Sequence, residues 1–129
     1  MPYSVEGTIN EHQMPVCRCC IINSATQKFV EVSAIIDTGA YDFFLKKSLI
    51  ELLELEQVGN ADSLHPVDGI ITSAVYKADL AVGTWRFDTT QFKILHSETY
   101  PVSVIIGSVF LTGKTFKYDG IQKTWILEW

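Results

Sequence analysis

The sequence predicts an all-β domain with one or two short helices, on three observations. Short apolar runs rich in Val, Ile and Phe recur along the chain, and turn residues such as Asn, Asp, Gly and Pro separate them. Apolar residues make up 47% of the 129 residues, which is enough for a packed core. The length is that of one domain, so residues 1–129 are predicted to form a single barrel or sandwich.

Extended segments dominate the first part of the chain. Residues 4–10, 16–22 and 29–36 are predicted strands, because each is rich in residues that favour extended backbone. The segment Asn-Ser-Ala-Thr at residues 23–26 has the composition of a turn between the second and third of these strands.

One helix is predicted after the third strand. Ser48 and Glu51 have the spacing of a capping box, in which the hydroxyl and the carboxylate each accept a hydrogen bond from a free backbone N–H. The apolar residues that follow fall on one helical face: Leu49, Leu52 and Leu53. We expect this helix to end by Val58.

The rest of the chain is predicted to contain hairpins and short strands. A first hairpin turns at residues 66–69, where Pro fixes φ and Gly supplies a positive φ. A second turns at residues 83–84, and a last one turns near residues 119–120. A second short helix is expected after Gly107. The predicted strands of this part cover residues 76–82, 85–87, 92–95, 102–106 and 125–129.

Charge and hydropathy exclude several function classes. Ten Lys+Arg against fifteen Asp+Glu give a net charge of −5, whereas a dedicated nucleic-acid binder normally carries an excess of basic residues. The sequence has no apolar run of about 18 residues, so we expect no membrane span in this segment. Its first residues lack the basic and apolar regions of a signal peptide.

The three cysteines are Cys17, Cys19 and Cys20. An odd number in so tight a cluster is a poor disulfide framework, and the spacing is not that of a zinc site. We therefore interpret them as small apolar residues on a strand, and we predict neither a metal nor another cofactor. Reduced thiols favour a cytoplasmic location.

Asp37 is the carboxylate with the most unusual setting. It follows the apolar end of a predicted buried strand, where a charge is costly unless it is partnered. Thr38, Gly39 and Ala40 come next, and Gly39 permits a tight turn that presents the carboxylate. An Asp-[Ser/Thr]-Gly triple alone occurs by chance in about one chain in fifteen of this length, so further signals are needed.

The segment Ala-Ile-Ile-Asp-Thr-Gly-Ala at residues 34–40 resembles the active-site motif of the aspartic proteases in its retroviral form. That family has a second signature, two apolar residues and a Gly that open a short helix, and Val-Ile-Ile-Gly at residues 104–107 is similar. The order of an early strand, a Pro-led hairpin, the Asp loop and a flap hairpin is similar too. The resemblance implies a closed acid-protease-type β-barrel, a single retropepsin lobe closest in style to bacterial and cellular single-domain members.

Two positions depart from the retroviral pattern. Retroviral members usually have an acidic residue two positions after the first Gly, paired with an Arg directly after the later Gly. This chain has Tyr41 and Ser108 at those positions. Both partners are missing together, so no charge is left unpaired. We expect Asp42 to supply part of the polar clamp that aligns the substrate backbone.

The resemblance implies an aspartic endopeptidase that acts on peptide or protein substrates. Its chemistry needs two carboxylates that share one proton. This chain has one motif, because Asp68-Gly69 and Asp119-Gly120 lack the intervening Thr or Ser. We therefore predict a homodimer in which each subunit contributes Asp37, with Thr38 and Gly39 completing the catalytic motif.

By the same resemblance, the flap is the hairpin around residues 64–71, although a plain surface hairpin has the same pattern. His65 beside it is interpreted as a solvated loop histidine. The apolar residues 125–129 form either a core strand or a strand of the dimer interface. The predicted substrate-contact residues are Ala40, Tyr41, Asp42, Pro66, Val67, Asp68, Gly69, Ile105 and Ile106.

Two other interpretations of the sequence remain open. One is a retropepsin-like binding or dimerisation module in which Asp37 no longer catalyses a reaction. The other is an unrelated β-barrel that binds a ligand or a partner and has the motif by chance. The intact Asp37-Thr38-Gly39 triple favours the protease.

Overall fold

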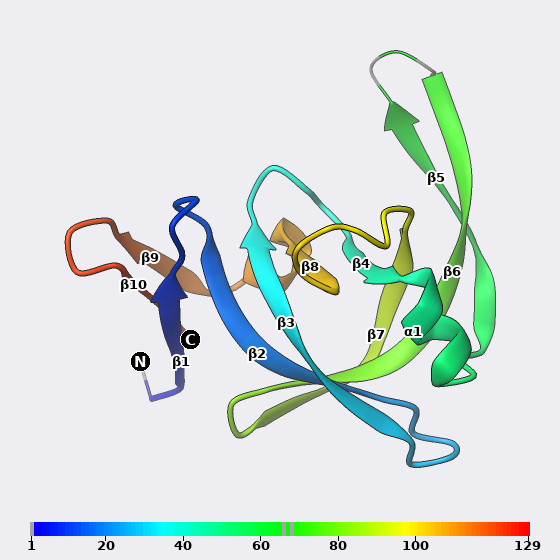
Figure 1. The fold of residues 1–129 in the computed structure, drawn as a ribbon, viewed down its shortest axis with the longest axis horizontal. Coiled ribbons are helices and arrows are strands. Elements are labelled where there is room, and N and C mark those ends of the chain that lie inside the picture. Colours follow the sequence, from blue (N-terminus) through cyan, green and yellow to red (C-terminus); the bar gives the residue numbers. More distant parts are fainter. Residues whose placement is uncertain (1, 66, 68) are drawn as a thin grey trace.

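The computed structural model describes residues 2–65, 67 and 69–129. Within these residues the chain forms ten strands, one α-helix and one 3-10 helix (Figure 1). The strands are β1 (Ser4–Ile9), β2 (Pro15–Ile22), β3 (Phe29–Asp37), β4 (Phe43–Lys46), β5 (Gln57–His65), β6 (Gly69–Val82), β7 (Trp85–Leu95), β8 (Val104–Gly107), β9 (Thr115–Asp119) and β10 (Thr124–Glu128). The helices are α1 (Lys47–Leu52) and the 3-10 helix η1 (Ser108–Leu111).

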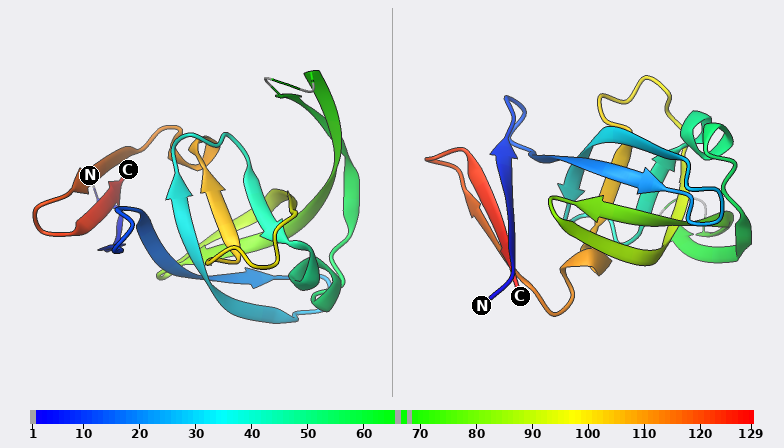
Figure 2. Two further views of the ribbon diagram at one scale, coloured as in Figure 1. Left: turned by 45° about the horizontal axis from the view of Figure 1, so that its top comes forward. Right: turned by 90° about the horizontal axis from the view of Figure 1, so that it is seen from below.

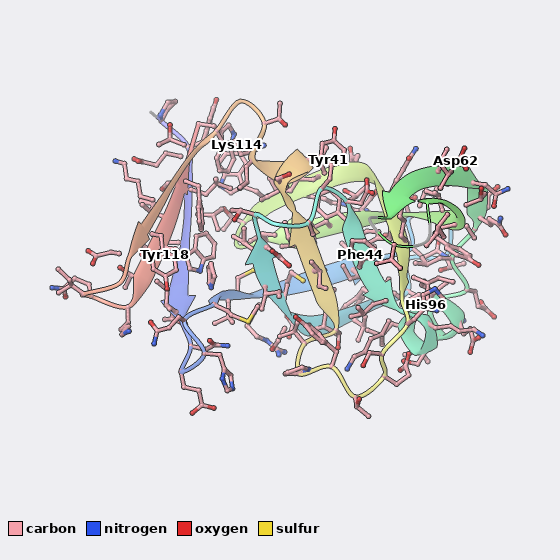
Figure 3. The ribbon with its side chains drawn as sticks, turned by 90° about the horizontal axis from the view of Figure 1, so that it is seen from above. Tyr41, Phe44, Asp62, His96, Lys114 and Tyr118 are labelled. Atoms are coloured by element: carbon pink, nitrogen blue, oxygen red, sulfur yellow. The ribbon has the colours of Figure 1, made fainter. Side chains whose placement is uncertain are left out.

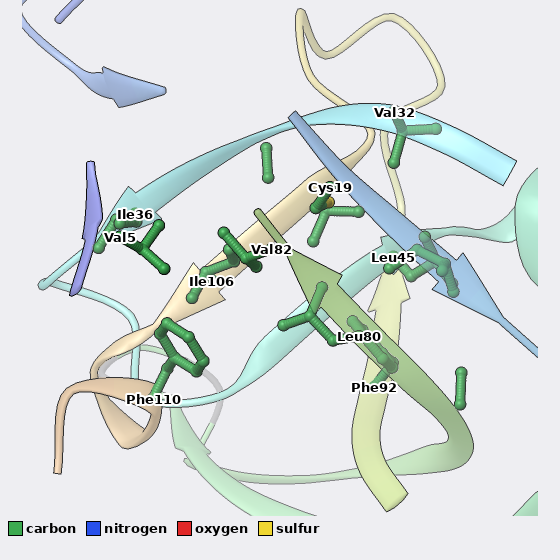
Figure 4. Close-up of a cluster of buried hydrophobic side chains, with 14 of the residues drawn as sticks. Val5, Cys19, Val32, Ile36, Leu45, Leu80, Val82, Phe92, Ile106 and Phe110 are labelled. Atoms are coloured by element: carbon green, nitrogen blue, oxygen red, sulfur yellow. The ribbon is translucent and has the colours of Figure 1, made fainter. Parts of the chain in front are cut away.

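Six strands form a closed ring of backbone pairings. The order β2-β3-β8-β4-β7-β6 returns to β2, because β6 pairs with both β7 and β2. The ring encloses the main core, which Figure 4 shows in close-up. Its fully buried side chains include Ile21, Leu45, Leu80, Phe92, Val104 and Ile106. The predicted all-β fold is confirmed, and its sheet is ring-like.

Two pairs of parallel strands lie on one side of this ring. β3 pairs with β8, so that Asp37 lies opposite Gly107, and β4 pairs with β7. Parallel neighbours need long crossover connections, which is why segments far apart in the sequence meet at this point. The short strand β4 was absent from the sequence-based prediction, and residues 85–87 and 92–95 belong to one strand, β7, instead of two.

The long strand β6 belongs to two structures at once. Its first half pairs with β5 in a two-stranded hairpin, and its second half pairs with β7 and β2 in the ring. Tyr76 is the junction, because it pairs with Gln57 in the hairpin and with Phe92 in the ring. We call residues 57–65 and 69–76 the hairpin arm, and Figure 1 shows it projecting beyond the ring in green.

The predicted helix is shorter than expected and is capped differently. It covers Lys47–Leu52, and its N-cap residue makes no side-chain capping bond. Ser48 lies inside the helix and donates its hydroxyl to Glu98, so the predicted capping box with Glu51 is wrong. Leu52 is exposed, whereas the neighbouring Leu53 is buried. Residues 57 and 58 belong to β5, so the chain leaves the helix well before the predicted end.

Strands β1, β10 and β9 continue the same sheet beside the ring (Figure 2), because the end of β1 also pairs with β2; we call these three strands the terminal sheet. β10 pairs along its length with β1 on one side and β9 on the other, and Trp125 and Leu127 are buried. Trp125 packs directly on Gly7, where a Cβ atom would lie 2.6 Å from the indole ring. The C-terminal segment is therefore a core strand with both edges occupied within the chain, and the free edge of this sheet belongs to β9.

An aromatic cluster joins the terminal sheet to the ring. The ammonium of Lys114 lies 4.9 Å from the ring centroid of Phe110, 5.6 Å from that of Trp129 and 5.7 Å from that of Phe87. It also donates to the backbone oxygen of Phe110 at 2.9 Å. Burial lowers the pKa of Lys114. These contacts fix the segment between η1 and β9.

The three cysteines are free thiols on β2, and Cys19 is buried. Burial raises the pKa of the Cys17 thiol to about 11, which favours the protonated thiol at neutral pH. Among the described residues, no group of three or more His, Cys, Asp or Glu side chains could hold a metal ion. The same part of the chain contains no helix of the length and hydropathy that crossing a bilayer requires.

Candidate active site

Asp37 is the last residue of β3 and begins a tight loop. The N–H of Gly39 donates to Oδ1 of Asp37 at 2.9 Å, and the N–H of Ala40 donates to the Asp37 backbone oxygen at 3.2 Å. A Cβ atom at Gly39 would lie 3.2 Å from that same Oδ1, so glycine allows this close approach. The loop therefore holds one carboxylate oxygen in place at the end of a ring strand.

Gly107 supports this loop from below. A Cβ atom at Gly107 would overlap the backbone oxygens of Asp42 and Tyr41, because the loop crosses directly over β8. The first N–H groups of η1 then bind the loop: Ser108 N donates to Ala40 O at 2.7 Å, and Val109 N donates to Tyr41 O at 3.0 Å. The apolar-apolar-Gly signature thus has a physical reason, since only glycine leaves room for the Asp loop.

An ion pair holds the far end of the loop. Lys93 on β7 donates to Oδ2 of Asp42 at 2.7 Å, and the Lys93 side chain is only 8% exposed. Sequence reasoning missed Lys93. The available signal was a lysine within the apolar run Phe-Lys-Ile-Leu at residues 92–95, where a buried cation requires a partner.

The predicted catalytic motif lies on an open surface of the single chain. Thr38 and Gly39 are exposed and Asp37 is half-buried. No hydrogen bond of the Thr38 hydroxyl is found within residues 2–65, 67 and 69–129. A cleft of about 670 Å³ lies elsewhere, between β1, β2 and the β6–β7 turn, and the residues of the Asp loop do not line it.

The predicted substrate-contact residues fall into three groups. Ala40, Tyr41 and Asp42 lie on the Asp loop, and Tyr41 is exposed. Figure 3 looks down on this loop from the side on which the arm projects, with Tyr41 on the loop and Asp62 on the arm. The other two groups lie at the end of the arm and on β8.

At the end of the arm, Gly69 is exposed and so is the side chain of Val67, by 87%. Pro66 and Asp68 lie outside the described residues. On β8, Ile106 is buried in the main core, whereas Ile105 belongs to a second cluster of buried residues with Ile35 and Val102. A single chain thus exposes the loop and the arm but buries both isoleucines.

Comparison with known proteins identifies the fold. No protein-family model matches the sequence, and no curated protein matches it by sequence. A retropepsin-like aspartic protease from Rickettsia conorii has a similar structure, with a TM-score of 0.65 and 16% identity over 98% of this chain and 91% of that chain. The fold is retropepsin-like. The retroviral protease-like domain of Ddi1 from Leishmania major is also similar, with a TM-score of 0.53 and 16% identity over 83% of this chain and 82% of that chain.

Proposed function

We propose that this chain is an aspartic endopeptidase that acts as a homodimer. One observation carries the proposal: in a retropepsin-like fold, the intact Asp37-Thr38-Gly39 turn lies on the β3–β8 pair, directly over Gly107. The two relatives named above are a retropepsin-like aspartic protease and a retroviral protease-like domain. The chain carries one such motif, so a complete site needs Asp37 from two copies.

The chemistry follows from two aspartates held at contact distance. Both cannot ionise comfortably, so the pair shares one proton and titrates as a unit. The ionised carboxylate accepts a proton from a water molecule, whose oxygen attacks the scissile carbonyl carbon. The protonated carboxylate donates a hydrogen bond to the carbonyl oxygen. Gly39 orients each carboxylate by its bond to Oδ1, which leaves Oδ2 available for the water or the partner.

Exposed groups around the loop have roles in this proposal. The Thr38 hydroxyl is exposed at the loop and reaches the loop of the second subunit across the two-fold axis. The arm acts as the flap, and its turn at residues 66–69 binds the substrate backbone. Exposed apolar side chains on the arm, among them Val67, Ile70 and Ile71, suit substrates with apolar residues near the cleaved bond.

The proposal also includes the cellular compartment of the enzyme. Free cysteines without a disulfide among the described residues fit a reducing compartment. We therefore assign the enzyme to the cytoplasm. Purification with and without reductant checks the thiol state on which this assignment depends.

The deciding experiment compares Asp37→Asn with Asp119→Asn. Both remove one carboxylate, but Asp119 ends β9, where its Oδ1 accepts from Ile121 and Gln122 of the following turn and an Asn oxygen can replace it. Cleavage of a mixed peptide library is measured at about pH 4 to 7, with and without a pepstatin-type inhibitor. We expect Asp37→Asn to lower kcat by about 10³-fold or more, and Asp119→Asn to leave it unchanged.

Two results would contradict the proposal. One is equal cleavage by the Asp37→Asn and wild-type proteins. The other is a folded wild-type dimer that cleaves no library peptide, which would favour the inactive binding or dimerisation module. Sedimentation at several concentrations tests the stoichiometry directly, because a strictly monomeric chain has only half of the proposed site.

A further inference from the structure

We propose that Lys93 is a positioning residue of the active site, and this inference rests on the proposed function. Lys93 is proposed to hold Asp42, and through it the end of the Asp loop, in the geometry that binds the substrate backbone. It is further proposed to set specificity, because its charge neutralises a carboxylate that would otherwise select basic side chains.

The burial of the Lys93 side chain needs a partner that compensates for it. Its side chain is almost fully buried on a ring strand, next to Phe92, which is completely buried. An ammonium in such surroundings is costly unless a charged or polar partner compensates for lost hydration. Asp42 is a partner of this kind, at 2.7 Å from the ammonium.

Three consecutive loop residues are anchored, each to a different group. The backbone oxygens of Ala40 and Tyr41 accept from the first N–H groups of η1, whereas Asp42 is anchored through its side chain to β7. The loop therefore spans from η1 to β7 across Gly107. Loss of the Lys93 ammonium would release the Asp42 end, directly before β4 begins at Phe43, and would loosen the adjoining bond from Val109 N to Tyr41 O.

Asp42 retains the capacity to bind a ligand. Lys93 occupies Oδ2, no contact to Oδ1 is found in the described part of the chain, and the side chain is 35% exposed. An ionised carboxylate oxygen accepts hydrogen bonds from peptide N–H groups. This oxygen lies on the loop that begins with Asp37, which is where an extended substrate has to pass in the proposed enzyme.

The charge of the pair then determines what this oxygen binds. A lone carboxylate at the site would attract Lys or Arg side chains of the substrate. Paired with Lys93, Asp42 carries no net local charge and favours a neutral donor such as a backbone N–H. The retroviral pattern has its acid and base at the positions of Tyr41 and Ser108, so this chain supplies both charges from other positions.

The experiment uses the intact dimer and four variants: Lys93→Met, Lys93→Arg, Asp42→Asn and, as a matched control, Lys117→Met. Lys117 also pairs with an acid, Glu128 at 2.8 Å, but it lies in the terminal sheet. KM and kcat are measured for two peptides that differ only in a neutral or a basic residue flanking the cleaved bond. Amide exchange at Ser108 and Val109 is measured in the same proteins.

We expect Lys93→Met to raise KM for the neutral peptide about 10-fold with a smaller change in kcat, and to shift preference toward the basic peptide. Lys93→Arg should keep KM within about 3-fold, because it retains a cation. Exchange at Val109 should accelerate in Lys93→Met and not in Lys117→Met. If Lys93→Met fails to fold, the double variant Lys93→Met/Asp42→Asn replaces it, since it leaves no unpaired charge.

The inference would be overturned if a folded Lys93→Met protein had the same KM, the same peptide preference and the same amide exchange as the wild type. The proposed function would remain intact in that case. A replacement double variant with a KM equal to that of wild type would also overturn the inference. If the wild-type dimer cleaves no peptide, the proposed function fails, and amide exchange alone then decides whether Lys93 positions the loop. Unchanged exchange in that case overturns the inference as well.

Discussion

The Asp loop at residues 37–42 and the hairpin arm differ in what holds them. The loop is attached to three neighbouring elements, through Gly107 on β8, the N–H groups of η1 and Lys93 on β7. Among the described residues, the two strands of the arm pair with each other until Tyr76 joins the ring, and Ile70 and Ile71 near its end are exposed, although Val75 beside Tyr76 is buried. Segments with few buried contacts open at lower free energy than core strands. The contrast indicates a loop held more firmly than the arm, which suits the carboxylate and the flap of the proposed enzyme.

The largest expected effect on stability and activity comes from Gly107→Ala, beneath the Asp loop. The backbone of Gly107 is extended, with φ −82° and ψ 174°, so alanine meets no conformational penalty. Its methyl group would instead overlap the backbone oxygens of the Asp loop. We expect the free energy of unfolding to fall by about 3 kcal/mol or more and peptide cleavage to be lost, as measured by urea unfolding and a cleavage assay.

Gly113→Ala is the matched control for that variant. Gly113 has φ +75°, and a Cβ atom at this position would meet no other atom within 4 Å, so alanine is disfavoured by backbone conformation alone. We expect a loss of about 1–2 kcal/mol with cleavage retained. Equal stability and activity losses in the two variants would show that the Asp loop is less tightly fixed than described.

On the arm, Ile70→Thr should separate stability from activity. Ile70 is 71% exposed, and Thr keeps the preference for extended backbone, so the free energy of unfolding should change by less than about 0.5 kcal/mol. If the arm covers the substrate, the lost apolar contact should raise KM about 5-fold. Ile121→Thr, at a side chain that is 90% exposed in the β9–β10 turn, should change neither quantity. A KM unaffected by Ile70→Thr would count against the arm as a flap.

The smallest effect on stability is expected at α1, which lies between the Asp loop and the arm in the sequence. The hydrogen bond from Ser48 lowers the pKa of Glu98. A carboxyl group whose pKa is lower in the folded state stabilises the fold above its ordinary pKa, and the contribution is lost as the pH falls through the folded value. Glu98→Gln should therefore lower Tm slightly at neutral pH and not at the acidic end. Melting curves from about pH 3 to 7 check this.

Glu51→Gln is the comparison variant, because Glu51 has the capping-box spacing but does not cap the helix. Its Tm difference from wild type should be smaller than that of Glu98→Gln at neutral pH. A larger difference for Glu51→Gln would restore the capping box as the source of helix stability.

The Asp loop and Gly107 beneath it were largely predictable from the sequence. Asp37, Gly39 and Gly107 carry local signals, since a carboxylate after an apolar run and a glycine before a helix depend on neighbouring residues only. Their close approach could be expected only from the resemblance to a known family. The structure adds its cause, which is the passage of the loop over Gly107.

Other features could not be predicted from the sequence, because they depend on residues that are distant along the chain. β5 has the sequence Gln-Val-Gly-Asn-Ala-Asp-Ser-Leu-His, which is poor in strand-favouring residues, and it is extended because β6 pairs with it. Glu98 replaces Glu51 as the partner of Ser48 from a loop far along the chain. Lys93 and Asp42 are likewise remote in sequence, so the lysine in an apolar run was visible but its partner was not.

The continuity of β6 through Tyr76 also has an evolutionary consequence. Tyr76 is the first residue of β6 that pairs in the ring and the last that pairs with β5, so all other arm pairings lie on one side of it. Insertions or deletions in the arm therefore leave the ring register unchanged. Because side chains alternate between the two faces of a strand, changes of two residues in each strand also preserve which face is apolar. If the arm is the flap, as proposed, its length can change in evolution without rebuilding the strands that carry Asp37.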